Sequence, residues 1–292
     1  MDGMVRLRDG RHLAYRETGP ADGVPMFFMH GTPGCRLDGW GEDELSASGV
    51  RQVSAERPGF GESDLDADRS LLGWGEDVRQ LADALDVERF VAVGGSGGAA
   101  HALACGAALG DRVTAIGLLS PGGPYFDHPE LATHPEFAAL VADARRDPAA
   151  ALARQVAFCD QEAGRMLGDP DGWVESVLAS MEGMDRELAE PFVREQVVRA
   201  AHAFKHGAVG WALDFFIVVA RPWGFDPAEL LTQVDLWAGD EDPATSAAAA
   251  WLAANLPRCS FHLLPHRGHS VDVGAAEFLG TMVAAHRAAP RS

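Results

Sequence analysis

The chain has 292 residues, of which 47% are hydrophobic and 23% are charged, so it can bury a sizeable core. Its formal net charge of −19 argues against nucleic acid and against anionic membranes as partners, because their phosphates repel an acidic surface. We therefore expect no nucleic-acid partner and no membrane partner.

Two further features bear on the compartment. The sequence starts with alternating apolar and polar residues and shows no basic region followed by an apolar signal segment. Apolar runs such as 215–220 are too short to cross a bilayer. The four cysteines are scattered and form no Cys-x-x-Cys pair, which favours reduced thiols over disulfides or zinc. We expect a soluble cytoplasmic protein.

The first 120 residues alternate between strands, glycine-containing loops and helices. Residues 4–18 predict a β-hairpin, because Val5 and Leu7 alternate with arginines before a typical hairpin turn at Asp9-Gly10. Apolar runs predict strands at 24–29, 50–55, 90–93 and 113–120, with helices at 71–85 and 99–108. This alternation predicts an α/β fold with a mostly parallel central sheet flanked by helices.

The alternation stops at Pro121-Gly122-Gly123-Pro124. Helical stretches follow at 137–146, 149–164, 173–183, 191–206 and 211–219. Strands are expected again at 234–238 and 260–264, with helices at 244–254 and 275–288. We interpret residues 124–226 as a helical cap inserted into a core domain made of residues 1–123 and 227–292.

The stretch around Ser96 is the main chemical signal. A short apolar run enters Gly94-Gly95-Ser96-Gly97-Gly98, and an alanine-rich helical segment leaves it. A strand that turns into a helix at Gly-x-Ser-x-Gly is typical of the nucleophile elbow of serine hydrolases. A serine hydroxyl reacts only when a base removes its proton and a third group holds that base.

Two later loops offer the acid and the base. Gly239-Asp240-Glu241-Asp242 follows one expected strand, and His266-Arg267-Gly268-His269 follows the next. Both loops should lie at the same edge of the sheet as Ser96. Spacing alone leaves Asp240 and His266 open beside Asp242 and His269.

These motifs together resemble the α/β-hydrolase fold family, from Val5 to the last helix. The resemblance is carried by the two late loops, the Ser96 turn, His30-Gly31-Thr32-Pro33-Gly34 and Arg57-Pro58-Gly59-Phe60-Gly61-Glu62-Ser63. It implies an α/β-hydrolase fold with an inserted cap, a serine–aspartate–histidine triad and no cofactor.

The resemblance also implies roles for single residues. Ser96 would be the nucleophile, Asp242 the acid and His269 the base. The N–H groups of Thr32 and Gly97 would form an oxyanion hole, and His30 and Gly31 would support the loop that carries Thr32. Asp242 could instead cap the helix expected near 243–244, and His266 fits an exposed loop histidine.

Other histidines have simpler interpretations. His202 and His206 share the i, i+4 spacing of a zinc-binding helix, but Ala203 stands where a metalloprotease carries its glutamate. No third ligand is evident, so we expect no metal. His101 and Cys105 lie on one face of the helix after Ser96, where packing explains them.

The expected function is a serine hydrolase that cleaves an ester, thioester or related acyl bond of a small, largely apolar substrate through a Ser96 acyl-enzyme. A carboxylic-ester hydrolase is the favoured activity, with no cofactor. One alternative is a proline iminopeptidase-like aminopeptidase, which has a further glycine where Thr32 stands. It would hold the substrate amine with cap acids such as Glu162, Asp185, Glu187 or Glu195.

Another alternative is a non-hydrolytic ligand-binding or receptor-type homologue. The sequence leaves three points open: the physiological substrate, the cap residues that contact it, and the oligomeric state.

Overall fold

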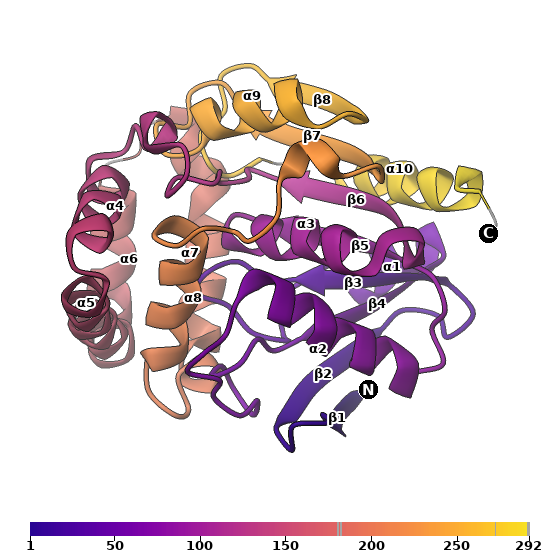
Figure 1. Cartoon of the computed structure of the whole chain (residues 1–292), viewed down its shortest axis with the longest axis horizontal. Helices are drawn as coiled ribbons and strands as arrows, with labels where there is room; N and C mark the ends of the chain where they lie inside the picture. The colour runs from indigo at the N-terminus through magenta and orange to yellow at the C-terminus, as the bar shows by residue number, and fades with distance from the viewer. Residues whose placement is uncertain (180, 182, 272, 291–292) are drawn as a thin grey trace.

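The computed structural model describes residues 1–179, 181, 183–271 and 273–290, and for 183–185 it describes the backbone only. This part contains an eight-stranded sheet with the strand order β1-β2-β4-β3-β5-β6-β7-β8 (Figure 1). The strands are β1 (Asp2–Arg6), β2 (His12–Thr18), β3 (Val24–Met29), β4 (Val50–Ala55), β5 (Phe90–Gly95), β6 (Val113–Leu119), β7 (Gln233–Gly239) and β8 (Cys259–Leu264).

The sheet is mostly parallel. β1 pairs with β2 and β2 with β4 in antiparallel fashion, and every other neighbouring pair is parallel. This confirms the fold class predicted from the alternation of strands and helices. Parallel strands end at one edge of a sheet, so the loops after β3, β5, β7 and β8 lie near one another there.

Helices cover both faces of the sheet. One face carries α2 (Leu71–Ala84), α3 (Gly97–Leu109) and α9 (Ser246–Asn255), whose apolar side chains share one buried cluster. The other face carries α1 (Glu42–Ser48) and α10 (Ala275–Ala288). The sheet is therefore the middle of three layers, as expected of an α/β fold.

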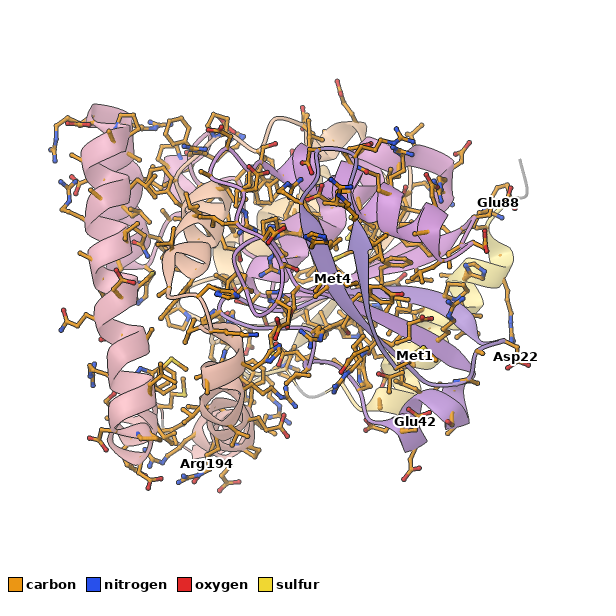
Figure 2. All side chains as sticks on the ribbon, turned by 90° about the horizontal axis from the view of Figure 1, so that it is seen from below. Met1, Met4, Asp22, Glu42, Glu88 and Arg194 are labelled. Carbon is orange, nitrogen blue, oxygen red and sulfur yellow. The ribbon has the colours of Figure 1, made fainter. Side chains whose placement is uncertain are left out.

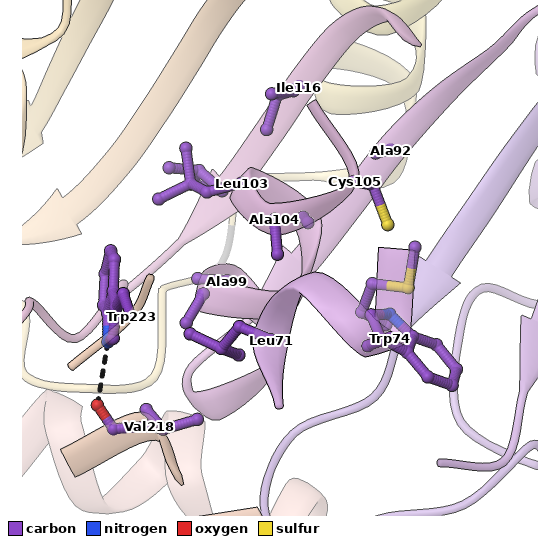
Figure 3. Close-up of a cluster of buried hydrophobic side chains, with 14 of the residues drawn as sticks. Leu71, Trp74, Ala92, Ala99, Leu103, Ala104, Cys105, Ile116, Val218 and Trp223 are labelled. Atoms are coloured by element: carbon purple, nitrogen blue, oxygen red, sulfur yellow. Dashed lines mark hydrogen bonds between the residues drawn. The ribbon is translucent and has the colours of Figure 1, made fainter. Parts of the chain in front are cut away.

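The alanines of α3 let this helix lie close to the sheet and to α2. Figure 3 shows Leu71 and Trp74 of α2 in the same buried cluster as Ala99 and Leu103 of α3. All four side chains are at least 97% buried. Close packing of α3 fixes the position of Ser96, the residue directly before it.

Between β6 and β7, the described residues form five helices, which lie on one side of the molecule in Figure 1. In Figure 2 this segment, marked by Arg194, lies on the opposite side of the view from Glu88, which precedes β5 of the sheet. The helices are α4 (Pro135–Arg146), α5 (Pro148–Gly168), α6 (Pro170–Leu178), α7 (Gly183–Ala203) and α8 (Val209–Val219). Among the described residues, no helix combines the length and the apolar character needed to cross a bilayer.

Short 3-10 turns complete the structure, at Gly110–Arg112, Pro129–Leu131 and Pro227–Glu229. Most predicted elements agree with the structure within a few residues, and the strands at 24–29 and 50–55 agree at both ends.

Two helix boundaries in the 124–226 segment were predicted wrongly. The helix expected at 173–183 ends at Leu178, and the one expected to begin at Pro191 begins at Gly183. Pro191 lies inside α7, where its fixed φ is compatible with a helix although its own N–H is missing. The same helix ends at Ala203, so His206 lies beyond it and does not share a helix face with His202.

The sequence analysis also missed α1. Its first turn has three acidic residues, which favour a helix N-terminus, and Glu44 accepts a hydrogen bond from the N–H of Gly41 at 2.9 Å. The helix ends at Ser48, and the next residue, Gly49, has a φ of 65° that is typical of a left-handed C-cap.

Candidate active site

Ser96 lies at the turn between β5 and α3, on backbone that is unusual for a residue with a side chain. Its φ of 52° and ψ of −123° are outside the helix and strand regions, and such strain concentrates at functional sites. A Cβ added to Gly94 would lie 2.2 Å from the carbonyl oxygen of Gly98, and one on Gly98 would lie 2.1 Å from that of Met29. The turn therefore requires glycine at both positions.

The imidazole of His269 lies between Ser96 and Asp242. Its Nε2 is 3.0 Å from the Oγ of Ser96, and its Nδ1 is 2.7 Å from the Oδ2 of Asp242. The three side chains come from loops after β5, β7 and β8, and the structure brings them together. A hydroxyl, an imidazole and a carboxylate in this order can move a proton from oxygen to nitrogen while the carboxylate holds the ring.

Asp242 also holds the turn before α9. Its Oδ1 accepts hydrogen bonds from the backbone N–H groups of Ala244, at 2.9 Å, and Thr245, at 3.3 Å, and the hydroxyl of Thr245 donates to Oδ2. The two interpretations of Asp242, as a turn cap and as the partner of His269, therefore apply together. Burial raises the pKa of Asp242, but hydrogen bonds from His269 and Thr245 outweigh burial and lower it to about 2.

Spacing alone had left Asp240 and His266 open as the acid and the base, but neither lies in the contact between Ser96, His269 and Asp242. The Oδ1 of Asp240 accepts from the backbone N–H of His266 at 2.7 Å, and the His266 ring contacts Glu241 at 3.0 Å. The His266 side chain is 84% exposed, as expected for a loop histidine.

Thr32 and Gly97 face each other beside Ser96. A Cβ added to Gly97 would lie 2.3 Å from the Oγ1 of Thr32 and 3.6 Å from its nitrogen. Within residues 1–179, 181, 183–271 and 273–290, neither the N–H of Thr32 nor that of Gly97 donates to a protein acceptor. Two such N–H groups next to a serine hydroxyl can stabilise negative charge on a substrate oxygen.

His30 braces the loop that carries Thr32. Its ring is fully buried, its Nδ1 donates to the carbonyl of Gly31 at 2.8 Å, and its Nε2 accepts from the N–H of Arg57 at 3.3 Å. Burial and the nearby Arg57 guanidinium hold the pKa of His30 well below its usual value, so the ring is neutral. A neutral, doubly hydrogen-bonded ring is suited to support rather than to proton transfer.

His101 does more than pack its helix. Its Nδ1 donates to the carbonyl of Gly97 at 2.9 Å, and its Nε2 lies 3.3 Å from Asp214 of α8 without hydrogen-bond geometry. Burial lowers the pKa of His101 to about 4.

The sequence analysis missed Asp214 and gave Arg57 no role, although both are central to this region. The Arg57 guanidinium donates to both carboxylate oxygens of Asp214, at 2.8 and 2.7 Å, and Arg69 also donates to Asp214. One signal was available: Asp214 is the single charged residue in the apolar run 211–219.

A cavity of about 150 Å³ opens beside Ser96. Apart from Ser96, His269, Thr32 and Thr245, its described lining is apolar, aromatic or backbone, and none of it is acidic. The lining residues are Thr32, Ser96, Gly97, Gly122, Tyr125, Phe137, Phe215, Val218, Val219, Ala244, Thr245 and His269.

A second hollow of about 870 Å³ is larger but lies elsewhere. Its lining includes Val113 and Gln233, the first residues of β6 and β7, so it lies at the strand ends opposite to Ser96. Because ligands of such folds bind at the carboxyl ends of strands, the smaller cavity is the candidate substrate site.

Three potential metal ligands, Cys35, Glu56 and His202, have ligand atoms within 4.8 Å of one another. The guanidinium of Arg36 lies in the same place, with Nη1 2.6 Å from Glu56 and 2.9 Å from the His202 ring. Burial raises the pKa of the Cys35 thiol to about 12, which disfavours the thiolate that a metal needs. An ion-paired contact between α7 and the core accounts for this cluster.

Three of the acids considered for an aminopeptidase, Glu162, Glu187 and Glu195, are described by the structure and do not line the cavity. Glu162 pairs with Arg165 and accepts from the indole N–H of Trp173, and Glu195 pairs with Arg199. Glu187 is exposed, and the side chain of Asp185 lies outside the described residues.

The comparisons with known proteins agree with this fold. Residues 24–272 match a family model described as alpha/beta hydrolase fold. Over 99 residues the chain is 34% identical to a non-heme chloroperoxidase from Streptomyces lividans, a match that covers 33% of this chain and 36% of that protein. The chain therefore matches only about a third of the length of this curated relative.

Solved structures resemble the chain over nearly its whole length. An esterase from Exiguobacterium antarcticum is 17% identical, covers 99% of this chain and 100% of its own, and has a TM-score of 0.68. A bromoperoxidase from Bacillus anthracis is 18% identical, with coverage of 98% and 99% and a TM-score of 0.68. At such identities the likeness shows a common fold.

Proposed function

Because the chain belongs to the α/β-hydrolase fold family, we propose that it is a serine hydrolase that cleaves an ester, thioester or related acyl bond of a small, largely apolar substrate. The observation that carries this proposal is the position of His269, within hydrogen-bond distance of both Ser96 and Asp242. A carboxylic-ester hydrolase is the first activity to test. One of the structural neighbours is itself named as an esterase.

In the first half of the reaction, the Oγ of Ser96 attacks the carbonyl carbon while Nε2 of His269 takes the hydroxyl proton. Asp242 stabilises the imidazolium that forms. The carbonyl oxygen becomes an oxyanion and accepts hydrogen bonds from the N–H groups of Thr32 and Gly97. Loss of one such donor typically costs about 3 kcal/mol of transition-state stabilisation.

The tetrahedral intermediate then collapses, and His269 gives its proton to the leaving alkoxide or thiolate. The acyl group remains on Ser96. A water molecule next attacks the acyl carbon while His269 takes one of its protons, and the acid leaves as Ser96 regains its hydrogen. Each proton transfer uses a side chain of this protein, so the proposed reaction needs no cofactor.

We propose residues 124–226 as a cap over a core of residues 1–123 and 227–292. Phe137 of α4 and Phe215, Val218 and Val219 of α8 line the cavity that also contains Ser96, which supports this division. The cap would therefore supply most of the apolar wall that faces the acyl group.

The size of the cavity supports a small acyl group. A dry cavity of about 150 Å³ holds a molecule of about six carbon atoms, such as benzene. Acetyl to butanoyl chains fit this space, and longer chains exceed its volume.

The four free cysteines, of which Cys35, Cys105 and Cys159 are buried, support a reducing compartment, and we propose the cytoplasm.

The discriminating experiment compares three readouts on the purified protein: turnover of p-nitrophenyl acyl esters, turnover of prolyl amides, and ligand binding without turnover. We expect short acyl esters to be hydrolysed fastest. Faster cleavage of prolyl amides would instead favour the aminopeptidase. Tight ligand binding with negligible turnover of every ester would favour the receptor-type homologue.

A further inference from the structure

Three charged side chains are buried behind the loop that carries Thr32. Asp214 of α8 is fully buried, as is Arg57, and the Arg69 side chain is only 3% exposed. Burial raises the pKa of Asp214, but Arg57 and Arg69 hold it well below its usual value, so the carboxylate stays charged. Buried charges persist when they are paired and hydrogen-bonded, as these are.

This cluster holds the loop by two routes. The first is Arg57, whose Nη1 donates to the carbonyl of His30 at 2.6 Å and whose Nη2 donates to that of Gly31 at 2.9 Å. The second is the hydroxyl of Thr32, which donates to Asp214 and accepts from Arg57 Nη2 at 3.1 Å.

Together the two routes constrain three successive residues, 30–32. The hydroxyl proton of Thr32 is committed to Asp214, so the hydroxyl is a structural link rather than a donor to substrate.

The helix that carries Asp214 also touches the substrate cavity. Phe215, Val218 and Val219 follow Asp214 on α8 and line the space beside Ser96. The end of α8 is closed by a local hydrogen bond, in which the indole N–H of Trp223 donates to the carbonyl of Val218 at 3.0 Å (Figure 3). Both side chains belong to the buried cluster that includes α2 and α3. One helix thus contacts both the acyl pocket and the loop of the oxyanion hole.

We propose that Asp214 is a positioning residue: through Arg57 and through the Thr32 hydroxyl, it fixes the direction in which the Thr32 N–H points. The inference rests on the proposed function, in which this N–H stabilises the oxyanion. Displacement of such a donor by about 1 Å can cost about 100-fold in rate, so its support matters even though Asp214 touches no substrate.

The test removes only the link and leaves the backbone donor in place. Thr32→Val replaces the hydroxyl by a methyl group of similar size, and Thr32→Ser restores the hydroxyl. For a short acyl ester, we expect Thr32→Val to lower kcat by about 10- to 100-fold with KM changed less than about threefold. Thr32→Ser should recover most of the kcat. An inhibitor that presents an oxyanion, such as a trifluoromethyl ketone, should weaken in parallel with kcat/KM.

Thr114→Val is the matched control. Thr114 is a buried threonine whose hydroxyl, like that of Thr32, is hydrogen-bonded within the protein. It bonds to Phe90 and His286 at the other end of the sheet. We expect this variant to lose stability without losing kcat. Asp214→Asn tests the same link from the other side, and in combination with Thr32→Val its effect on kcat should be less than additive.

The outcomes separate this inference from the proposed function. Wild-type kcat in Thr32→Val, or no recovery in Thr32→Ser, would overturn the positioning role while hydrolysis that depends on Ser96 remains. Turnover that survives Ser96→Ala would overturn the proposed function itself.

Discussion

Asp242 accepts a hydrogen bond from Nδ1 of His269 at 2.7 Å, and the side chain of Asp242 is almost fully buried. The carboxylate holds the ring so that Nε2 faces Ser96. In Asp242→Asn, His269 should therefore remain in the site, but its ring should no longer be held in the orientation and tautomer that the reaction needs. We expect a loss of about 10,000-fold in kcat for ester hydrolysis, measured by steady-state kinetics.

The neighbouring Asp240→Asn is the control for this variant, because Asp240 bonds to His266 on an exposed loop. We expect it to keep kcat within about threefold of wild type. Equal losses in the two variants would contradict the assignment of Asp242.

The lowered pKa of Asp242 predicts how stability depends on pH. A folded-state pKa of about 2, below the usual 3.8, contributes stability that is present above pH 3.8 and is lost as the pH falls towards 2. The contribution is about 2 kcal/mol. Urea unfolding of wild type and Asp242→Asn between pH 6 and pH 2 should show the wild-type advantage shrinking by this amount. An advantage that does not change with pH would contradict the lowered pKa.

The cavity predicts the preferred acyl length. Phe215→Ala removes a ring from its wall, so the optimum should move from chains of two to four carbons to longer ones, as measured by kcat/KM for p-nitrophenyl esters. Each additional buried methylene can contribute about 0.8 kcal/mol. Phe261→Ala, at a partly exposed position on β8, should leave the optimum unchanged. The same shift in both variants would rule out α8 as the wall.

The tight turn around Ser96 predicts that Gly98 and Gly164 differ in how well they tolerate substitution by alanine. A Cβ at Gly98 would lie 2.1 Å from a backbone oxygen, so Gly98→Ala should cost about 3 kcal/mol or more in the free energy of unfolding and should abolish activity. Gly164→Ala, in α5 with open space around it, should be neutral or stabilising by up to about 1 kcal/mol. Thermal unfolding followed by circular dichroism measures both, and a tolerated Gly98→Ala would contradict the tight turn.

Much of the fold could be predicted because the strands are short apolar runs that end in glycine-rich loops. Both ends of the strand at 24–29 were predicted correctly, because a continuous run of apolar residues indicates a strand buried on both faces. Boundaries failed in α6 and α7, where helical composition continues on both sides of the true break. Pro191 was the misleading residue, because proline more often begins a helix than lies within one.

In the candidate site, the residues that lie in recognisable motifs could be predicted from the sequence. The buried residues that hold those motifs in place could not. The partner of Arg57 is Asp214, 157 residues further along the chain, and no local pattern links them. Asp214 is the single carboxylate of an apolar helix, and such a residue is rarely buried unless it is paired, but nothing in the sequence identifies Arg57 and Arg69 as its partners. Spacing alone left Asp240 and Asp242 open, and only the family resemblance favoured Asp242, because the path of the loop decides which carboxylate comes within reach of His269.

The central claim is that Ser96 is the nucleophile, and its most direct test is intact-mass spectrometry with a fluorophosphonate probe, followed by ester turnover of the same samples. The wild type should gain one adduct, which peptide mapping locates on Ser96, and should lose its turnover in proportion. Ser96→Ala should gain no adduct and show no turnover above background. Turnover of Ser96→Ala at the wild-type rate would contradict the account.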